Sequence, residues 1–200
     1  EMLHWSEGAR NLVARVELLR SRDEDVGAEA WPDMSEASLT TSVSEWMGPF
    51  LYGVTNRQQI AAVDVQQALM TLLSPEQVRL LSELCPEHVA LPTGTRAPID
   101  YSNSQGPTVT VALQEVLGTA SLPALLGGDL PLSIALLNPG KRVIQITTDL
   151  ERFWNGAYKE VRKEMRGRYP KHYWPEDPAN AVPSTQTSKK QRAAKGASIE

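Results

Sequence analysis

The sequence from residue 149 to residue 166 reads DLERFWNGAYKEVRKEMR, and it is the most informative stretch of this 200-residue chain. At 100° per residue its apolar side chains fall on one side of a helix. They are Leu150, Phe153, Trp154, Ala157, Tyr158, Val161 and Met165. The opposite side, over an arc of about 100°, carries Arg152, Lys159, Arg162, Lys163 and Arg166. The pattern predicts one long amphipathic helix that packs on a sheet and presents its cations to water.

The segment after this helix mixes cations with aromatic residues and reads GRYPKHYWP over residues 167–175. Gly167 is typical of a left-handed helix C-cap, and the prolines keep the chain extended. Such a mixture suits single-stranded RNA, because cations neutralise phosphates and rings stack on unpaired bases. We therefore predict RNA contacts from Arg152, Lys159, Arg162, Lys163, Arg166, Arg168, Tyr169, Lys171, His172 and Trp174.

Two other interpretations of the basic aromatic pattern remain open at this point. The rings of Tyr169, Tyr173 and Trp174 could pack on the core and leave the cations merely solvated. Cations near a helix C-terminus stabilise the negative end of the helix dipole without any ligand. The basic face could also bind an acidic partner, so the alternative function is a protein-interaction or scaffolding module.

Five short β-rich runs precede the helix, separated by turns rich in Gly, Pro and Asn. They cover residues 88–92, 97–102, 108–116, 130–137 and 142–147. In the third run polar and apolar residues alternate up to Gln114 and Glu115, where the strand should end or bend. Strands this close together, joined by turns, predict a small antiparallel sheet.

The first 86 residues show helical spacing of apolar residues behind good N-caps. Ser6, Ser35, Asp64 and Ser74 are the expected caps, and Gln77 completes a capping box with Ser74. The Ser35 helix should carry Leu39, Val43, Trp46, Met47 and Phe50 on one face and stop around Gly48 and Pro49. We interpret these apolar stripes as helix packing.

The predicted fold class is therefore α+β, with three parts along the chain. Residues 1–86 form a helical part, and residues 87–180 form a small antiparallel sheet with the long basic-faced helix. Residues 181–200 are predicted to be a disordered tail, because the chain from Ser184 is polar and has no apolar period.

The net charge of −4 conceals a polarised chain. Residues 1–140 hold seven Arg and no Lys against seventeen Asp and Glu, whereas residues 141–200 hold thirteen Lys and Arg against seven acids. Such asymmetry points to a nucleic-acid or acidic-partner surface. No apolar run approaches the roughly 20 residues of a membrane span. The single cysteine, Cys85, fits a reducing cytoplasm, and the start at Glu1 suggests a piece of a longer chain.

Several catalytic patterns are missing from the sequence. Gly140 and Lys141 are followed by Arg142, and position 135 is Ala, so the phosphate-binding loop pattern fails. There is no Asp-Glu-x-His string and no nucleophile elbow. Three isolated histidines and one cysteine do not reach metal-ligand spacing. We therefore expect no catalytic residue, cofactor or metal in this chain.

A resemblance rests on the same basic stretch. Residues 153–172, FWNGAYKEVRKEMRGRYPKH, followed by WPEDP at 174–178, closely resemble the C-terminal signature of HrpB-type helicases. WPDMS at 31–35, the turn PTGTR at 92–96 with Asp100 and Tyr101, and the stretch from LPL at 130–132 to ITTDL at 146–150 look like the same family. The resemblance covers roughly residues 10–180.

HrpB-type proteins are bacterial DEAH/RHA helicases with two RecA-like ATPase domains, a helical ratchet-type domain, an OB-like domain and a C-terminal extension. The resemblance implies that this chain is that non-catalytic extension with a little upstream sequence. It implies a parent that is an ATP-dependent RNA helicase using ATP and Mg²⁺ upstream of this chain. The expected partners are RNA and the upstream helicase domains, with no membrane and a cytoplasmic location.

Overall fold

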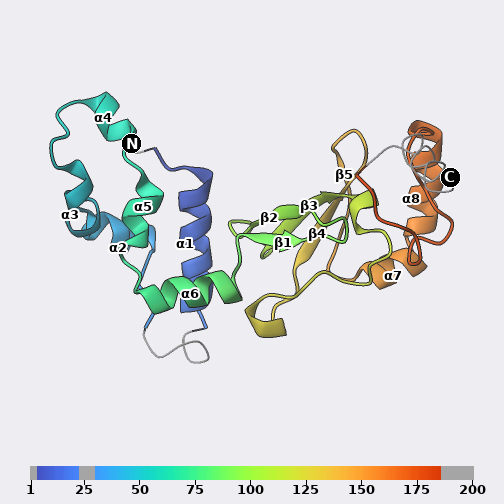
Figure 1. The fold of residues 1–200 in the computed structure, drawn as a ribbon, viewed down its shortest axis with the longest axis horizontal. Coiled ribbons are helices and arrows are strands. Elements are labelled where there is room, and N and C mark those ends of the chain that lie inside the picture. Colours follow the sequence, from blue (N-terminus) through green and yellow to red (C-terminus); the bar gives the residue numbers. More distant parts are fainter. Residues whose placement is uncertain (1–3, 23–29, 186–200) are drawn as a thin grey trace, which may run out of the picture. The chain divides into compact units, whose positions relative to one another are not determined.

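The computed structural model describes residues 4–22 and 30–185 (Figure 1). The chain divides into two compact units, Glu1–Pro86 and Glu87–Glu200. The first unit is helical, and the second contains a five-stranded sheet together with helices. The predicted α+β class is confirmed. None of the described helices combines the length and apolar composition needed to cross a membrane.

Short capped helices make up the N-terminal unit. They are α1 (Glu7–Arg20), α2 (Glu36–Thr41), α3 (Val43–Trp46), the 3-10 helix η1 (Gly48–Leu51), α4 (Arg57–Ala61), α5 (Val65–Met70) and α6 (Pro75–Leu84). The predicted caps are confirmed: the Ser6 hydroxyl and the Asp64 carboxylate accept backbone N–H groups at 3.1 and 3.0 Å. Ser74 and Gln77 form the predicted reciprocal capping box at 3.2 and 2.9 Å.

The helix predicted after Ser35 is divided into α2, α3 and η1, so the expectation of one helix is wrong. Hydroxyl groups explain the break, because Thr40, Thr41 and Ser42 each donate to a backbone carbonyl of the preceding turn. Trp46 remains buried, whereas Val43 is 40% exposed. Helix α4, which Asn56 caps, was not predicted.

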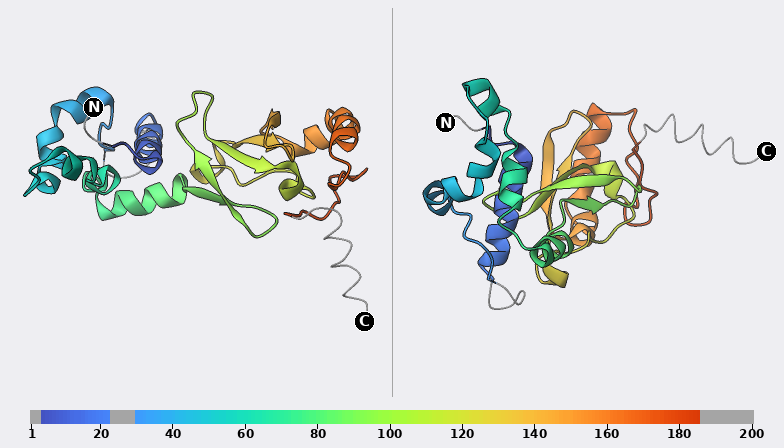
Figure 2. Two further views of the ribbon diagram at one scale, coloured as in Figure 1. Left: turned by 90° about the horizontal axis from the view of Figure 1, so that it is seen from above. Right: turned by 60° about the vertical axis from the view of Figure 1, so that its left-hand side comes forward.

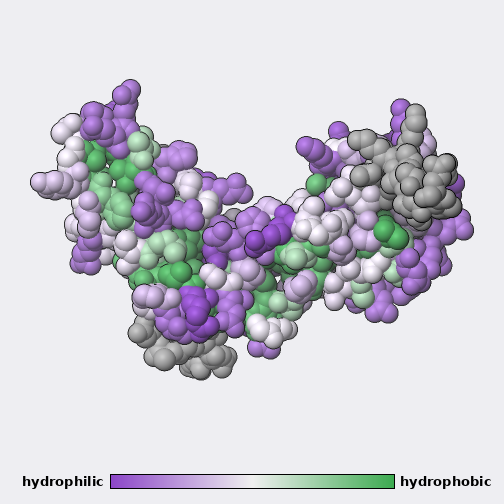
Figure 3. Space-filling view, in the orientation of Figure 1, coloured by the Kyte–Doolittle hydropathy of each residue, from purple (hydrophilic) through white to green (hydrophobic). Residues whose placement is uncertain are grey.

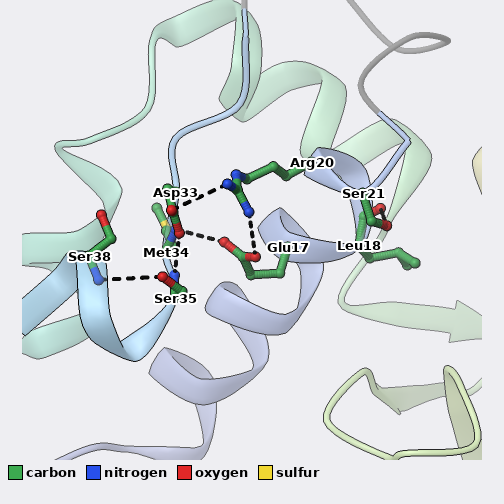
Figure 4. A network of polar contacts seen from close by, with 8 residues as sticks. All are labelled: Glu17, Leu18, Arg20, Ser21, Asp33, Met34, Ser35 and Ser38. Carbon is green, nitrogen blue, oxygen red and sulfur yellow. Dashed lines mark hydrogen bonds and ion pairs between the residues drawn. The ribbon is translucent and has the colours of Figure 1, made fainter.

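Polar contacts fasten the segment before α2 to α1 (Figure 4). Glu17 Oε1 accepts the Met34 N–H at 2.7 Å, and Arg20 lies 3.2 Å from Asp33 and 3.3 Å from Glu17. Hydrogen bonds from Ser35 lower the pKa of Asp33, and Arg20 adds to that effect. These contacts hold Met34 in the core, where it is fully buried.

A second link, deeper in the same unit, is made by Arg15 of α1. Its guanidinium is buried and donates to the carbonyl oxygens of Cys85 at 2.6 Å and Leu81 at 3.3 Å. The last carbonyls of a helix lack intrahelical partners. Arg15 therefore caps the C-terminus of α6 and joins it to α1.

The C-terminal unit is built around a sheet, which Figure 2 shows from two further directions. The strand order in this sheet is β1-β2-β3-β4-β5. Its strands are β1 (His88–Ala90), β2 (Arg96–Asp100), β3 (Thr108–Ala112), β4 (Ser133–Leu137) and β5 (Val143–Thr147). The prediction of a wholly antiparallel sheet is wrong at one pair, because β3 and β4 are parallel. Their connection, residues 113–132, contains the 3-10 helices Leu113–Val116 and Leu126–Gly128 and is long enough for a crossover. The predicted end of the strand near Gln114 is confirmed.

The predicted long helix is also wrong as a continuous element. It is α7 (Leu150–Asn155) followed by α8 (Tyr158–Arg168), with a break at Gly156, where φ is −115° and ψ is −102°. Glycine weakens a helix interior, which accounts for the position of the break. The prediction that Gly167 forms the C-cap is also wrong. Gly167 lies inside α8, and Tyr169 is the C-cap residue.

Most apolar residues of the predicted face nevertheless point inward, although Ala157, next to the break, is exposed. Phe153, Trp154 and Tyr158 form one ring cluster, with centroids 5.0 to 6.0 Å apart, and all three are buried. The Trp154 indole donates to the Thr119 carbonyl at 2.7 Å. The break at Gly156 therefore leaves the apolar face shared between α7 and α8.

The tail predicted over residues 181–200 lies mostly outside the described residues, which end at 185. Its described beginning is packed: Ala181 is buried, and the Ser184 N–H donates to the Gln114 carbonyl at 2.9 Å. The contacts of the C-terminal unit therefore continue to at least Ser184 among the described residues.

Most of the surface visible in Figure 3 is hydrophilic, with smaller apolar areas on both units. The large apolar side chains exposed among the described residues are Val43, Leu51, Tyr52, Val143, Ile146 and Val182.

Candidate nucleic-acid interface

Three exposed cations follow one side of α8. Lys159, Lys163 and Arg166 recur at spacings of four and three residues, which places them on neighbouring turns of the same face. None of them forms an ion pair with any residue in the described part of the chain. Tyr158 and Met165, on the other side of the helix, are buried. We call Lys159, Lys163 and Arg166 the cation stripe.

Arg162 lies beside the stripe but serves a different purpose. Its Nε donates to the Trp174 carbonyl at 3.1 Å, and its Nη2 lies 2.8 Å from Glu176 Oε1. The Tyr158 hydroxyl donates to the Pro175 carbonyl at 2.9 Å, and burial raises the pKa of Tyr158 so that it remains a donor. Arg162 and Tyr158 thus bind the returning segment, residues 173–176, to α8. Arg162 is withdrawn from the predicted RNA contacts.

Trp174 is also withdrawn, because the residue is only 6% exposed and its indole donates to the Tyr169 carbonyl at 3.0 Å. A buried ring cannot stack on an unpaired base. Tyr169 and His172 are half-buried and meet edge to face, with ring centroids 6.2 Å apart. Trp174 therefore follows the alternative interpretation, in which the aromatic rings of this segment pack on the core.

Three further cations of the predicted set are exposed, but they lie outside the cation stripe. Arg152 lies on α7, before the break, and makes no ion pair within the described ranges. Arg168 lies 3.8 Å from Glu164, an exposed pair that stabilises little. Lys171 is exposed in the segment that follows α8. The structure thus divides the predicted set into cations on the stripe, cations near it and one structural arginine.

Two cations that the sequence interpretation did not select come close to the same surface. A Cβ placed on Gly140 would lie 2.5 Å from the Tyr169 hydroxyl oxygen, so the turn between β4 and β5 touches the C-cap of α8. Lys141 and Arg142 follow Gly140, and both are exposed. The available signal was the position of Lys141, the first lysine of the chain, where the charge balance reverses. Residues 138–176 carry nine Lys and Arg against five acids, a net charge of +4.

The turn at Gly140 and Lys141 also lacks the geometry for cradling a nucleotide phosphate. It closes the antiparallel β4–β5 hairpin, whereas a phosphate-binding loop leads from a strand into a helix N-terminus. Within the described ranges, no group of three or more His, Cys, Asp or Glu residues is placed to hold a metal ion. The site that the geometry does offer is a cationic surface.

The family model for ATP-dependent helicase C-terminal regions, HrpB_C, matches residues 46–178, which include the whole of this surface. The chain belongs to this HrpB C-terminal family. It is 45% identical over 189 residues to the ATP-dependent RNA helicase HrpB of Escherichia coli (strain K12), covering 94% of this chain. It spans 23% of the length of that relative.

Two solved structures of the family have the same fold. A crystal structure of the E. coli DExH-box NTPase HrpB matches with a TM-score of 0.81 and 38% identity, over 91% of this chain and 22% of that one. A crystal structure of the Escherichia coli DEAH/RHA helicase HrpB matches with a TM-score of 0.68 and 36% identity, over 86% and 22%. The resemblance to HrpB-type helicases is therefore confirmed.

Proposed function

We propose that this chain is an RNA-contacting accessory region of an ATP-dependent RNA helicase, and that it has no catalytic site of its own. The observation that carries the proposal is the cation stripe, Lys159, Lys163 and Arg166, exposed on α8 without partners among the described residues. The E. coli relative is named an ATP-dependent RNA helicase, which supports RNA as the polyanion.

The stripe has the physical properties that a phosphate-binding surface requires. Its cations already lie in water, so binding a phosphate breaks no internal ion pair. Each phosphate that a cation neutralises releases counterions. The logarithm of the binding constant therefore falls with the logarithm of the salt concentration, with a slope of about 0.7 per contact for single strands. The buried side of α8, anchored by Tyr158 and Met165, fixes the direction of the stripe.

ATP hydrolysis is proposed for the parent protein only. ATP and Mg²⁺ would be bound by other parts of that parent, because the sequence has no phosphate-binding loop pattern and the described residues hold no carboxylate cluster placed for a metal ion. Within the parent, the region would position RNA or the upstream ATPase domains. We propose that the protein acts in the cytoplasm, because its single cysteine is compatible with a reducing compartment.

The test is a titration of the 200-residue chain with a fluorescent single-stranded oligouridylate at several salt concentrations. The variant Lys159→Gln/Lys163→Gln/Arg166→Gln removes the stripe while keeping good helix formers. Loss of three contacts predicts about 100-fold weaker binding at 0.1 M salt and a salt slope lower by roughly 2.

The matched control is Arg10→Gln/Arg57→Gln/Arg96→Gln, which removes three exposed cations elsewhere and changes the net charge equally. It should bind RNA nearly as well as the wild type. Absence of RNA binding by the wild-type chain at low salt, or equal losses in both variants, rejects the proposal. Binding of polyglutamate in preference to RNA would instead identify the stripe as a docking surface for an acidic protein.

A further inference from the structure

The turn from Asn138 to Arg142 is a rigid platform for two cations. Asn138 is buried, its N–H donates to the Arg142 carbonyl at 2.9 Å, and its side-chain oxygen accepts the Arg142 N–H at 3.1 Å. The Lys141 N–H donates to the Asn138 carbonyl at 2.9 Å. Three hydrogen bonds to one buried asparagine therefore fix the turn, and with it the bases of the Lys141 and Arg142 side chains.

Lys141 adopts a backbone conformation that lysine rarely takes. Its φ of +58° lies in the left-handed region, where a side chain other than Gly, Asn or Asp is strained. Strain of this kind persists only where the surroundings hold it, and it gathers at functional sites. An asparagine would fit the turn better, so the backbone gives no reason for a lysine at this position. Its exposed ammonium group does give one.

Contact with Tyr169 joins this turn to the proposed RNA surface. A Cβ on Gly140 would lie 2.5 Å from the Tyr169 hydroxyl oxygen and 3.5 Å from the ring carbon that bears it. The Tyr169 N–H in turn donates to the Met165 carbonyl at 2.7 Å and ends α8. The turn is therefore in direct contact with the C-terminal end of α8. Arg166, the last cation of the stripe, lies in the final turn of the same helix. Figure 1 shows α8 and the β4–β5 hairpin within the same unit.

We infer that Lys141 and Arg142 form a second phosphate-binding element, so that an RNA strand runs from the cation stripe across the end of α8 to this turn. This inference rests on the proposed RNA-contacting function. Tyr169 acts as a positioning residue that sets the turn against the helix. Two cationic elements from different parts of the fold can follow the backbone of a single strand, whatever its base sequence.

The variant Lys141→Asn/Arg142→Gln tests the role of the charges. Asparagine tolerates the left-handed conformation, so the hairpin is retained while two charges are removed. Loss of two contacts predicts about 25-fold weaker binding of the oligouridylate at 0.1 M salt, with a salt slope lower by roughly 1.4. The control Arg57→Gln/Arg96→Gln removes two exposed cations elsewhere and should leave binding within about twofold of the wild type.

A second pair of variants tests the positioning by Tyr169. Gly140 does not have a positive φ, so alanine is strained there only by what its methyl group meets. In Gly140→Ala the added methyl group should push the turn away from the Tyr169 hydroxyl. We expect this displacement to weaken RNA binding several-fold. Gly140→Ala/Tyr169→Phe removes that hydroxyl and should restore binding. Failure of the rescue overturns the positioning role, because the Asn138 oxygen, 3.2 Å from the same Cβ, would then be the obstacle.

The outcomes separate this inference from the function on which it rests. If removal of the cation stripe abolishes binding but Lys141→Asn/Arg142→Gln binds like the wild type, the second element is rejected and the RNA-contacting function stands. If the wild-type chain does not bind the oligouridylate at low salt, both are rejected. Unchanged melting of the double variant, together with its lost affinity, supports the inference and excludes misfolding.

Discussion

Replacing Tyr158 by phenylalanine tests how the returning segment is held on α8. The substitution keeps the ring, so it opens no cavity, and it removes only the hydroxyl that donates to the Pro175 carbonyl at 2.9 Å. Tyr158 is 1% exposed and Pro175 is buried, so water cannot replace the lost donor. An unsatisfied buried acceptor costs about 1–3 kcal/mol. We expect a loss of about 1.5 kcal/mol in unfolding free energy and a fall in melting temperature of roughly 6 °C.

The assay is urea and thermal unfolding of the 200-residue chain, followed by tryptophan fluorescence. Trp154 lies 5.4 Å from Tyr158 between ring centroids and reports on the C-terminal unit. The control is Tyr173→Phe, the same chemical change at a half-buried ring whose hydroxyl has no hydrogen-bond partner in the described ranges. It should alter stability by less than about 0.5 kcal/mol. An equal effect of the two substitutions would refute the reasoning.

Three further predictions concern the N-terminal unit. Arg15→Met removes the Arg15 donor of the buried Cys85 carbonyl, while the Leu81 carbonyl keeps the Cys85 N–H, and should destabilise the chain by about 1–3 kcal/mol in urea unfolding, whereas Arg10→Met should be nearly neutral. Ser74→Ala removes the capping box and should lower the melting temperature by an amount equivalent to about 1 kcal/mol, unlike Ser82→Ala in the same helix. Burial raises the pKa of the Cys85 thiol to about 12, so a coloured disulfide reagent should label it at pH 8 only after unfolding. Because the unfolded thiol ionises near pH 9 and the folded one does not, the contribution of Cys85 to stability should decline as the pH rises from 9 to 12, so Cys85→Ala should lose less stability than the wild type over that range.

Local signals in the sequence were sufficient wherever a residue's partner lies within a few positions. The caps at Ser6, Asp64 and Ser74 are of this kind, because the side chain and the N–H group it accepts are three residues apart. The inward faces of α7 and α8 follow equally from helical periodicity. These features could be predicted because their physics is short-range.

The predictions from sequence were wrong where contacts between distant segments determine the structure. Strand spacing indicated an antiparallel sheet, but nothing local distinguishes a long hairpin loop from the crossover that makes β3 and β4 parallel. The helical wheel placed Arg162 among the solvent-facing cations, yet Trp174 and Glu176, more than ten residues later, bind it. The contact between Gly140 and Tyr169 likewise joins residues that the sequence keeps apart.

The fold separates cations that hold the structure from cations that remain available. Arg15 is buried and Arg162 is half-buried, and both donate to backbone carbonyls, so neither can bind a phosphate without loss of stability. The cation stripe makes no such contact among the described residues and can exchange water for phosphate at little structural cost. Charge reversal at Arg162 would therefore weaken RNA binding only by unfolding its own support, whereas neutralising the stripe should weaken binding and leave the melting temperature unchanged. Measuring stability and affinity on the same variants is what distinguishes an RNA surface from a basic surface that merely keeps its helix in place.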